Sequence, residues 1–391
     1  MKKRFASFVT LQRGFDLPKT EMCDGPFPVV GSTSIIGYHE KFKVEAPDVV
    51  TGRSGSLGVV QFIKERYWPH NTSLWVKDFK GNDPQFVYYH LKVLNLARFN
   101  AGAGVPTLNR NHLDTLELDI PSLPIQRKIA AILSAYDDLI KNSERRIKIL
   151  EDMAQNLYHE WFVKFRFPGH EKVKMVNSPM GKIPEGWEVT SIGQIIETLG
   201  GGTPSTKREE YWDGGIINWY SPSDLTAANS LFIRESSRKI TPTGLHNSSA
   251  KLFPSYSVMM TSRATIGVTT INTTEACTNQ GFIVCIPNAC LTMAHIYFWI
   301  RDNFTQIISV ASGATFKEIS RGEFRELLII LPPERIESEF SSLMGPFFKA
   351  IENLLYRNQN LRQTRDLLLP RLISGEVDVA ELDITVQELN H

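Results

Sequence analysis

The chain has 391 residues, of which 42% are hydrophobic and 22% are charged. This length corresponds to two or three domains of ordinary size, and this composition is sufficient for real hydrophobic cores, so we expect an ordinary soluble globular protein. The 43 basic and 42 acidic side chains give a net charge of +1, which neither indicates nor excludes a polyanionic partner. Nucleic-acid binding therefore has to be argued from local patches.

Targeting and metal-binding signals are missing. No run approaches the ~20 apolar residues that span a bilayer, and the N-terminus leads into polar sequence, so we expect a cytoplasmic protein without a membrane partner. The cysteines form no Cys-x-x-Cys pair and have no histidine at finger spacing, which argues against structural zinc. We expect buried free thiols in the second half of the chain. The four cysteines are Cys23, Cys277, Cys285 and Cys290.

Residues 1–121 have the pattern of a first globular domain. Short β-type runs such as Val59–Ile63 are separated by turn residues, and a short helix is expected near Pro84–Leu96. The domain is predicted to be mixed α/β (α+β), and a proline-punctuated segment, Asp119–Pro124, closes it.

A long helix follows over residues 122–167, with Pro124 in its first turn, where proline is tolerated. Apolar residues repeat every seven positions over four heptads, which predicts a coiled-coil seam. One set of seam positions is Leu133, Ile140, Ile147, Ala154 and Trp161, and the other is Tyr136, Ser143, Leu150 and Leu157.

The second half repeats this plan. Residues 168–184 are expected to be a polar linker, and residues 185–332 a second mixed globule with a strand at Phe282–Ile286 and a helix near Met293–Phe304. A second long helix is predicted over 333–376, followed by a tail, 377–391. Its seam is Met344, Ile351, Asn358 and Arg365 on one side, and Phe347, Leu354, Leu361 and Leu368 on the other.

The two halves are an internal repeat. The helices match at an offset of 211 residues, and the globules match at offsets of 208 to 210, for example Thr51–Arg53 with Thr261–Arg263 and Asn71–Val76 with Asn279–Val284. Such a period is too long for a solenoid and indicates tandem domains.

We expect the helices to form an antiparallel intramolecular pair, in which polar Asn358 and Arg365 fix the register. An intermolecular coiled coil is the alternative. The leftover faces with Phe162, Phe165 and Phe348 are expected to need a partner.

Three stretches resemble a known family. The start of the second half, with Pro184–Val189, Gly200–Ser205 and Tyr211–Trp212, resembles the entry of a target recognition domain in specificity (S) subunits of type I restriction-modification systems. Pro121–Leu133 resembles the central conserved region of that family, and Leu367–Val377 resembles the end of its distal conserved region. The first half departs from the pattern, because it begins at Phe5–Phe8 without a Pro-Glu-Gly-Trp entry. Either the N-terminus is naturally short or residues before Met1 are missing.

The resemblance implies that each globule is a target recognition domain that reads one half of an interrupted sequence in double-stranded DNA. The helices would act as a spacer and would dock methyltransferase (M) subunits, in two copies given the repeat. Restriction/translocase (R) subunits would join through the complex.

Candidate DNA contacts fall into two groups. Arginine can form two hydrogen bonds to guanine or to a phosphate, and asparagine can form two to adenine. Because the two halves are expected to read different sequences, a residue that both halves share is more consistent with phosphate contact or a structural role than with base reading. The shared candidates are Arg53 with neighbouring Ser54, Arg263, Asn71, Asn279, Arg110 and Arg321. Polar residues that differ between the halves are better candidates for base reading: Lys64, Arg66 and His70 in the first, and Thr203, Ser205, Lys207, Arg208, Asn218 and Thr265 in the second. Plainer alternatives are a solvated loop at Thr203–Arg208 and a satisfied histidine at His70.

Motifs for catalysis are missing. The sequence has no Gly-x-x-x-x-Gly-Lys-[Ser/Thr] loop and no Asp/Asn-Pro-Pro-Tyr/Phe motif, so we expect no cofactor and no catalysis by this chain, with S-adenosylmethionine held by a partner subunit. A coiled-coil scaffold whose globules bind proteins is the rival hypothesis, and a self-contained nuclease or methyltransferase is a third.

Overall fold

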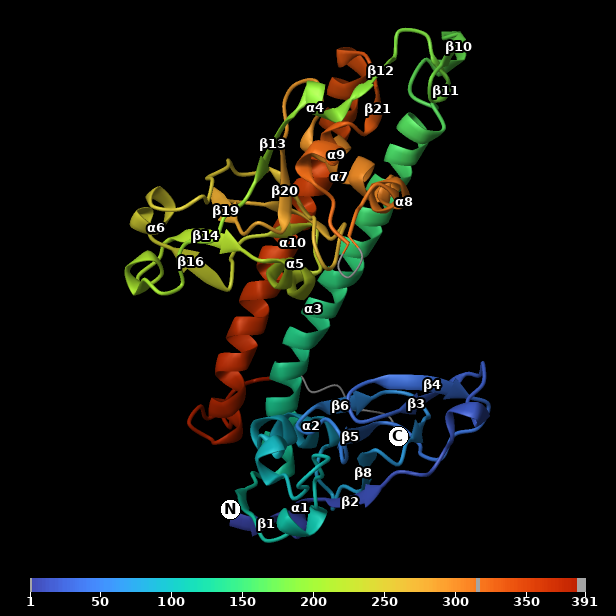
Figure 1. The fold of residues 1–391 in the computed structure, drawn as a ribbon. Helices are drawn as coiled ribbons and strands as arrows, with labels where there is room; N and C mark the ends of the chain where they lie inside the picture. The colour runs from blue at the N-terminus through green and yellow to red at the C-terminus, as the bar shows by residue number, and fades with distance from the viewer. Residues whose placement is uncertain (1, 314–316, 385–391) are drawn as a thin grey trace. The chain divides into compact units, whose positions relative to one another are not determined.

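The computed structural model describes residues 2–313 and 317–384. The chain divides into two compact units: unit 1 comprises Met1–Asn142 and Arg357–His391, and unit 2 comprises Ser143–Tyr356. Two long helices, α3 (Leu123–Tyr158) and α10 (Glu334–Ile373), each contribute one part to either unit (Figure 1). The predicted mixed fold with two globular domains and two long helices is confirmed.

Unit 1 contains a four-stranded sheet in the order β2-β8-β5-β6, a three-stranded sheet β4-β3-β7 and the pair β1-β9. Its strands are β1 (Lys2–Arg4), β2 (Thr10–Arg13), β3 (Phe27–Val30), β4 (Ile35–His39), β5 (Asp48–Gly52), β6 (Val60–Ile63), β7 (Trp68–Pro69), β8 (Ser73–Asp78) and β9 (Glu117–Asp119). Its short helices are α1 (Phe5–Phe8), η1 (Lys19–Glu21), α2 (Pro84–Val93), η2 (Leu96–Phe99) and η3 (Arg110–His112).

Unit 2 contains a five-stranded sheet β13-β20-β17-β18-β15, a three-stranded sheet β16-β14-β19 and the pairs β12-β21 and β10-β11. The strands are β10 (Met175–Ser178), β11 (Gly181–Pro184), β12 (Glu188–Ser191), β13 (Glu197–Gly200), β14 (Ile217–Tyr220), β15 (Phe232–Ile233), β16 (Arg238–Ile240), β17 (Val258–Thr261), β18 (Thr269–Asn272), β19 (Ala276–Thr278), β20 (Phe282–Ile286) and β21 (Leu328–Leu331). The helices are η4 (His159–Val163), η5 (His170–Lys172), α4 (Ile192–Ile195), η6 (Glu209–Tyr211), α5 (Pro222–Ala228), α6 (Pro242–His246), α7 (Met293–Asp302), α8 (Phe304–Ser309) and α9 (Arg321–Arg325). In Figure 1 the three-stranded sheet lies on the side of unit 2 away from the long helices.

The two units have the same sheet plan, and the strand register corrects the offset between them. Thr51 pairs with Val60 and with Leu74 in unit 1, as Met260 pairs with Thr269 and with Ile283 in unit 2. Each of these pairs of positions differs by 209. The sequence-based matches at 210 around Arg53 and at 208 around Asn71 were therefore wrong by one residue, and the side chains they aligned are not equivalent.

The long helices pack antiparallel within each unit. In unit 1, Asp137 of α3 accepts a hydrogen bond from Arg365 of α10 at 2.5 Å, and it also accepts one from the Tyr89 hydroxyl at 2.6 Å. In unit 2, the rings of Trp161, in η4 at the end of α3, and Phe340 lie 5.7 Å apart. All five residues of the predicted first seam are buried, namely Leu133, Ile140, Ile147, Ala154 and Trp161.

Three local expectations were wrong. Residues 168–184, predicted to be a polar linker with little periodicity, contain regular structure that the sequence did not indicate, because β10 and β11 form a hairpin there. Phe162 and Phe348 do not lie on uncovered faces; they are 7% and 3% exposed, packed inside unit 2, and Phe165 is partly buried against the same core. Buried thiols are confirmed for Cys277 and Cys285, whereas Cys290 is exposed.

Candidate nucleic-acid interface

A seven-residue loop follows the central strand of each unit. In unit 1 it joins β5 to β6, and the Gly52 amide donates to the Val59 carbonyl at 3.4 Å; in unit 2 the Thr261 amide donates to Val268 at 2.9 Å. Residues at matching places have positive φ: Gly55 (87°) matches Ala264 (59°), and Gly58 (90°) matches Gly267 (91°). A left-handed alanine is costly, so its presence at the glycine position shows that both units need the same turn.

The corrected register shows that Arg53 and Arg263, one in the loop of each unit, are not at equivalent positions. Arg53 matches Ser262, and Arg263 matches Ser54. The Arg53 guanidinium donates to the Asn71 carbonyl at 3.4 Å, whereas Arg263 forms an ion pair with Glu318 at 2.6 Å and is exposed. Arg53 and Arg263 therefore do not occupy a shared position, and their contacts differ.

A polar cluster beside each loop occupies matching backbone positions. The cluster comprises Asp16, His70 and Asn71 in unit 1 and Thr203, Asn279 and Gln280 in unit 2. The match is set by the backbone, because the Phe15 amide donates to Pro69 at 2.8 Å as the Gly202 amide donates to Thr278 at 2.9 Å.

Each cluster contains the same contact made by different side chains. Asn71 donates a hydrogen bond to Asp16 in unit 1, and Thr203 donates to Gln280 at 2.7 Å in unit 2. His70 bonds Thr72 Oγ1 at 2.9 Å and the Leu17 carbonyl at 3.2 Å. The two units thus present different hydrogen-bonding groups on one framework. Asp16 and Gln280 were not selected from the sequence, because Gln280 matches Asn71 only at the offset of 209 and Asp16 matches Thr203 at an offset of 187.

The other basic candidates lie on exposed loops, and Lys64, Arg66 and Arg208 have partners within their own unit. Lys64 lies 3.8 Å from Asp138, and Arg66 pairs with Glu45 at 2.8 Å. In unit 2, Arg208 lies 3.3 Å from Glu210. Lys207, Ser205 and Thr265 are exposed; the Ser205 carbonyl accepts a hydrogen bond from Trp212 at 3.1 Å, and the Thr265 carbonyl accepts one from Thr261. Surface pairs of this kind are weak enough to exchange for a phosphate.

Three candidates have structural roles instead. Asn218 is 7% exposed, and its amide donates to the Arg234 carbonyl at 2.9 Å and to Thr274 at 3.0 Å, so it holds β14 in place. Arg110 donates to the carbonyl of Leu11 in β2 at 3.1 Å, and Arg321 reaches the matching carbonyl of Thr198 in β13 at 3.5 Å. We therefore leave these three residues out of the proposed contact set.

An aromatic and basic pair in unit 2 adds a candidate. The Arg238 guanidinium lies 3.6 Å from the ring centroid of Trp212, and this ring packs edge-on against Trp219 at 5.1 Å. Stacking orients the exposed guanidinium without using its hydrogen-bond donors, so they stay available for a phosphate or a base edge. No spacing rule links residues 26 positions apart, so the sequence alone gave no signal for this pair.

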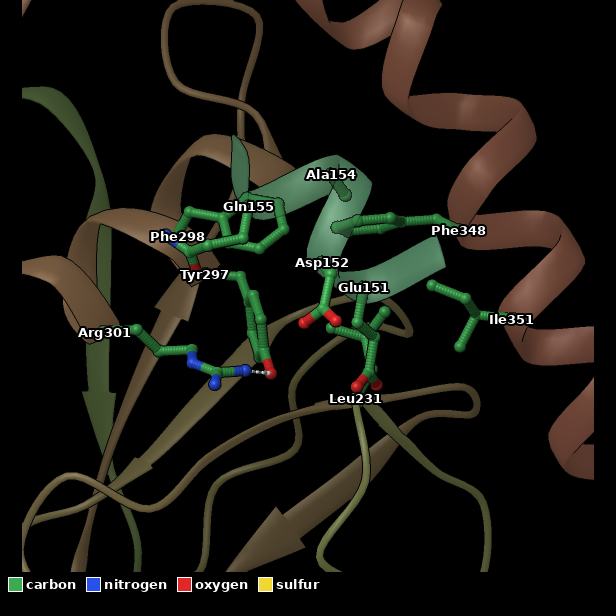
Figure 2. A pocket seen from close by; sticks show the side chains of 10 residues that line it. All are labelled: Glu151, Asp152, Ala154, Gln155, Leu231, Tyr297, Phe298, Arg301, Phe348 and Ile351. Carbon is green, nitrogen blue, oxygen red and sulfur yellow. Dashed lines mark hydrogen bonds between the residues drawn. The ribbon is translucent and has the colours of Figure 1, made fainter. Parts of the chain in front are cut away.

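A small cavity in unit 2 offers no comparable surface. It measures about 80 Å³ and lies where α3, α7 and α10 meet (Figure 2). Glu151, whose pKa burial raises, and Arg301 lie at its edge, and Arg301 donates to the Tyr297 hydroxyl at 2.6 Å. Within residues 2–313 and 317–384, no group of three or more His, Cys, Asp or Glu side chains could hold a metal ion. None of the helices in this part of the chain has the length and apolar character needed to cross a membrane.

Comparison with known proteins matches residues 2–152 and 184–362 to the family model described as the type I restriction modification DNA specificity domain. A type I restriction enzyme specificity subunit of Methanocaldococcus jannaschii is 29% identical, over 76% of this chain and 70% of the relative. One from Haemophilus influenzae is 24% identical, over 70% and 71%. The solved S subunit of M. genitalium has the same fold, with a TM-score of 0.65 and 16% identity over 95% of each chain.

Proposed function

The chain belongs to the family of type I restriction-modification DNA specificity domains, and on this premise we propose that it supplies such a complex with its DNA sequence specificity. Residues 1–121 and 185–332 would be the two recognition domains, each reading one half of an interrupted target in double-stranded DNA. The observation that carries this proposal is the pair of polar clusters, which sit at matching backbone positions and have different chemistry.

The chemistry of the clusters suits base reading. Donor and acceptor patterns in the major groove identify bases, whereas phosphate contacts position the protein without reporting sequence. Asp16, His70 and Asn71 offer a carboxylate, an imidazole and an amide, whereas Thr203, Asn279 and Gln280 offer a hydroxyl and two amides. Two such different sets are expected to select two different half-sites. Lys207, Arg208 and Arg238 would contact phosphates of the half-site read by unit 2.

The long helices, 122–167 and 333–376, would act as the spacer between the recognition domains. A helix of 40 residues such as α10 is about 60 Å long, which is the length that a spacer of this kind could supply. We further propose that methyltransferase subunits dock on these helices in two copies, since the repeated framework offers two similar binding places. Restriction subunits would join through that complex, and S-adenosylmethionine would be bound by the methyltransferase.

The test is to co-express the chain with the methyltransferase subunit of its own system and to sequence methylated bases in the host DNA. A single interrupted motif with two fixed half-sites is the expected result. A stable complex that yields no motif would overturn the proposal in favour of the protein-binding scaffold.

Two variants assign the half-sites. Asn71→Ala should change only one half of the motif, and Gln280→Ala should change only the other. Lys182→Ala, an exposed lysine on the β10-β11 hairpin, is the control and should leave both halves unchanged. A change in both halves from either amide variant would contradict separate reading.

A further inference from the structure

Each unit has one buried tryptophan at a matching pair of positions in its three-stranded sheet. In unit 1, Val29 of β3 pairs with Trp68 of β7, and in unit 2, Trp219 of β14 pairs with Cys277 of β19. The pairs match because the amide that follows β7 and the amide that follows β19 each donate to the last residue of the neighbouring strand, at 2.9 and 3.0 Å. The indole at this place is therefore supplied by a different strand in each unit.

Both indoles make the same hydrogen bond. Trp68 Nε1 donates to the Phe15 carbonyl at 3.4 Å, and Trp219 Nε1 donates to the Gly202 carbonyl at 2.9 Å. Phe15 and Gly202 are matching residues, and each directly precedes the first residue of the polar cluster in its unit. Because different strands supply the donor, the repeated contact indicates that the carbonyl before each cluster has to be held in place.

Each indole also lies beside an exposed cation. The Lys43 ammonium is 4.8 Å from the ring centroid of Trp68 and 5.6 Å from that of Phe15. In unit 2 the Arg238 guanidinium is 5.8 Å from the ring centroid of Trp219. An aromatic ring attracts a cation through its face and leaves the N–H donors of that cation available. Lys43 is therefore the counterpart in unit 1 of the stacked arginine in unit 2.

Lys43 differs from the other basic candidates of unit 1 in how it is held. Within residues 2–313 and 317–384, Lys43 forms no ion pair, whereas Lys64 and Arg66 each pair with a carboxylate. The Lys43 amide donates to the Tyr67 carbonyl at 3.0 Å, which fixes its backbone beside β7. Aromatic contacts and a backbone hydrogen bond thus hold this cation next to the polar cluster.

We propose that Lys43 binds a DNA phosphate next to the bases that unit 1 reads, and that Trp68 is the positioning residue that fixes this cation relative to the Asp16–Asn71 pair. The inference rests on the proposed function. Phosphate contacts set the register of a protein on a duplex, so a base-reading pair benefits from a firm link to one of them. The indole provides this link, since it contacts the Lys43 ammonium through its face and the Phe15 carbonyl through its N–H.

The test uses the full chain in complex with the methyltransferase subunit of its own system, and a fluorescein-labelled duplex that carries the methylated motif. Fluorescence anisotropy gives the affinity over a series of salt concentrations. Lys43→Met should lower the slope of log affinity against log salt by about one and leave the motif unchanged, because one phosphate contact is lost. Lys43→Arg keeps the charge and should keep the slope. Lys77→Met, at an exposed lysine near the other end of β8 from the cluster, is the matched control and should bind as the wild type does.

Variants of Trp68 test the link. Trp68→Phe keeps an aromatic face for Lys43 but removes the N–H donor, so the salt slope should stay the same. The preference for the motif over a duplex changed in the half-site of unit 1 should fall about three- to tenfold, as expected for one lost hydrogen bond. The preference over a duplex changed in the other half-site should not fall. Trp68→Leu also removes the aromatic face and should lower the slope as Lys43→Met does, and the two changes combined should lower it no further.

The possible failures are distinguishable. If the wild-type complex binds the motif and a scrambled duplex equally, the proposed function fails and this inference fails with it. If the wild-type complex prefers the motif but Lys43→Met keeps the wild-type slope, only the phosphate contact is overturned. Unchanged preferences in Trp68→Phe, or additive losses of slope in the combined variant, would refute the positioning role of Trp68.

Discussion

Glu337, near the start of α10 in unit 2, is a buried charge whose removal should be costly. It is 0% exposed, it accepts a hydrogen bond from the Thr292 amide at 2.9 Å, and it bonds His295 Nδ1 at 2.7 Å. Burial acts to raise the pKa of this carboxyl, but the attraction of His295 and the hydrogen bonds outweigh it and hold the pKa below its ordinary value. Thus Glu337 both caps the first turn of α7 and gives the buried His295 ring a hydrogen-bond partner.

The repeat shows which substitution Glu337 tolerates. Its counterpart in unit 1 is Gln126, whose side-chain oxygen accepts the Asp83 amide at 3.0 Å at the start of α2, and the counterpart of His295 is Phe86. Glu337→Gln keeps the cap and should cost about 1–2 kcal/mol. Glu337→Ala removes the cap and leaves His295 unpaired, at a cost of about 3–5 kcal/mol.

Calorimetry of the full chain measures this difference. For a domain of this size 1 kcal/mol shifts the melting temperature by about 2–4 °C, so the unit 2 transition of Glu337→Ala should fall by about 6–20 °C. His295→Phe combined with Glu337→Gln copies unit 1 and should recover stability to within about 1 kcal/mol of the wild type. If the alanine and glutamine variants melt within 2 °C of each other, the reasoning about the buried pair is refuted.

Three other perturbations test the charge arrangement. Burial raises the pKa of Asp48 from 3.8 to about 7. The stability contributed by the protonated Asp48 carboxyl is therefore fully present below about pH 4 and is lost as the pH rises through about 7. Asp48→Asn should reduce the loss of urea resistance between about pH 5 and pH 8, and an unchanged pH profile would count against this. Arg365→Met should destabilise unit 1 by about 1–3 kcal/mol, because the Asp137 carboxylate loses its cation. Adding Asp137→Asn should restore most of this loss in urea unfolding, because it removes the charge and keeps an acceptor for the Tyr89 hydroxyl. Lys207→Ala should lower the slope of log affinity against log salt by about one without altering the target motif, whereas a changed motif would mean that Lys207 reads a base.

The sequence was sufficient for the parts of the fold that follow periodic rules. Heptad spacing predicted the positions of both long helices, because an apolar pattern that repeats every seven residues over four heptads is not expected of strands or loops. The repeat was visible for the same reason, since its offset is constant along an uninterrupted helix. The hairpin within residues 168–184 was not predicted, although Gly181, with a φ of 96°, stands in its turn.

The candidate site could be predicted only in outline. Arg53 with Arg263, and Asn71 with Asn279, were matched because their side chains agree, but strand register is set by backbone hydrogen bonds and burial. Gly58 and Gly267, by contrast, do lie at the correct offset of 209, since a turn with positive φ restricts the residue type at that place. Identical polar residues at loop ends carry no such restriction, so they are poor guides to structural equivalence.

The same contrast explains how one framework accommodates two readers. In each unit, side chains at matching positions hold the backbone in place. Arg110 and Arg321 donate to the carbonyls of matching strands, and Gln126 and Glu337 accept from amides at the starts of matching helices. Within the clusters, His70 bonds the Leu17 carbonyl and Asn279 accepts the Gly281 amide at 2.8 Å, so these two residues also hold their loops. The facing pairs, Asp16 with Asn71 and Thr203 with Gln280, are joined through their side chains and can differ without disturbing the strands beneath them. A change of specificity in one unit therefore needs no compensation in the other, and an exchange of these two pairs between units should transfer half-site preference while leaving both folds intact.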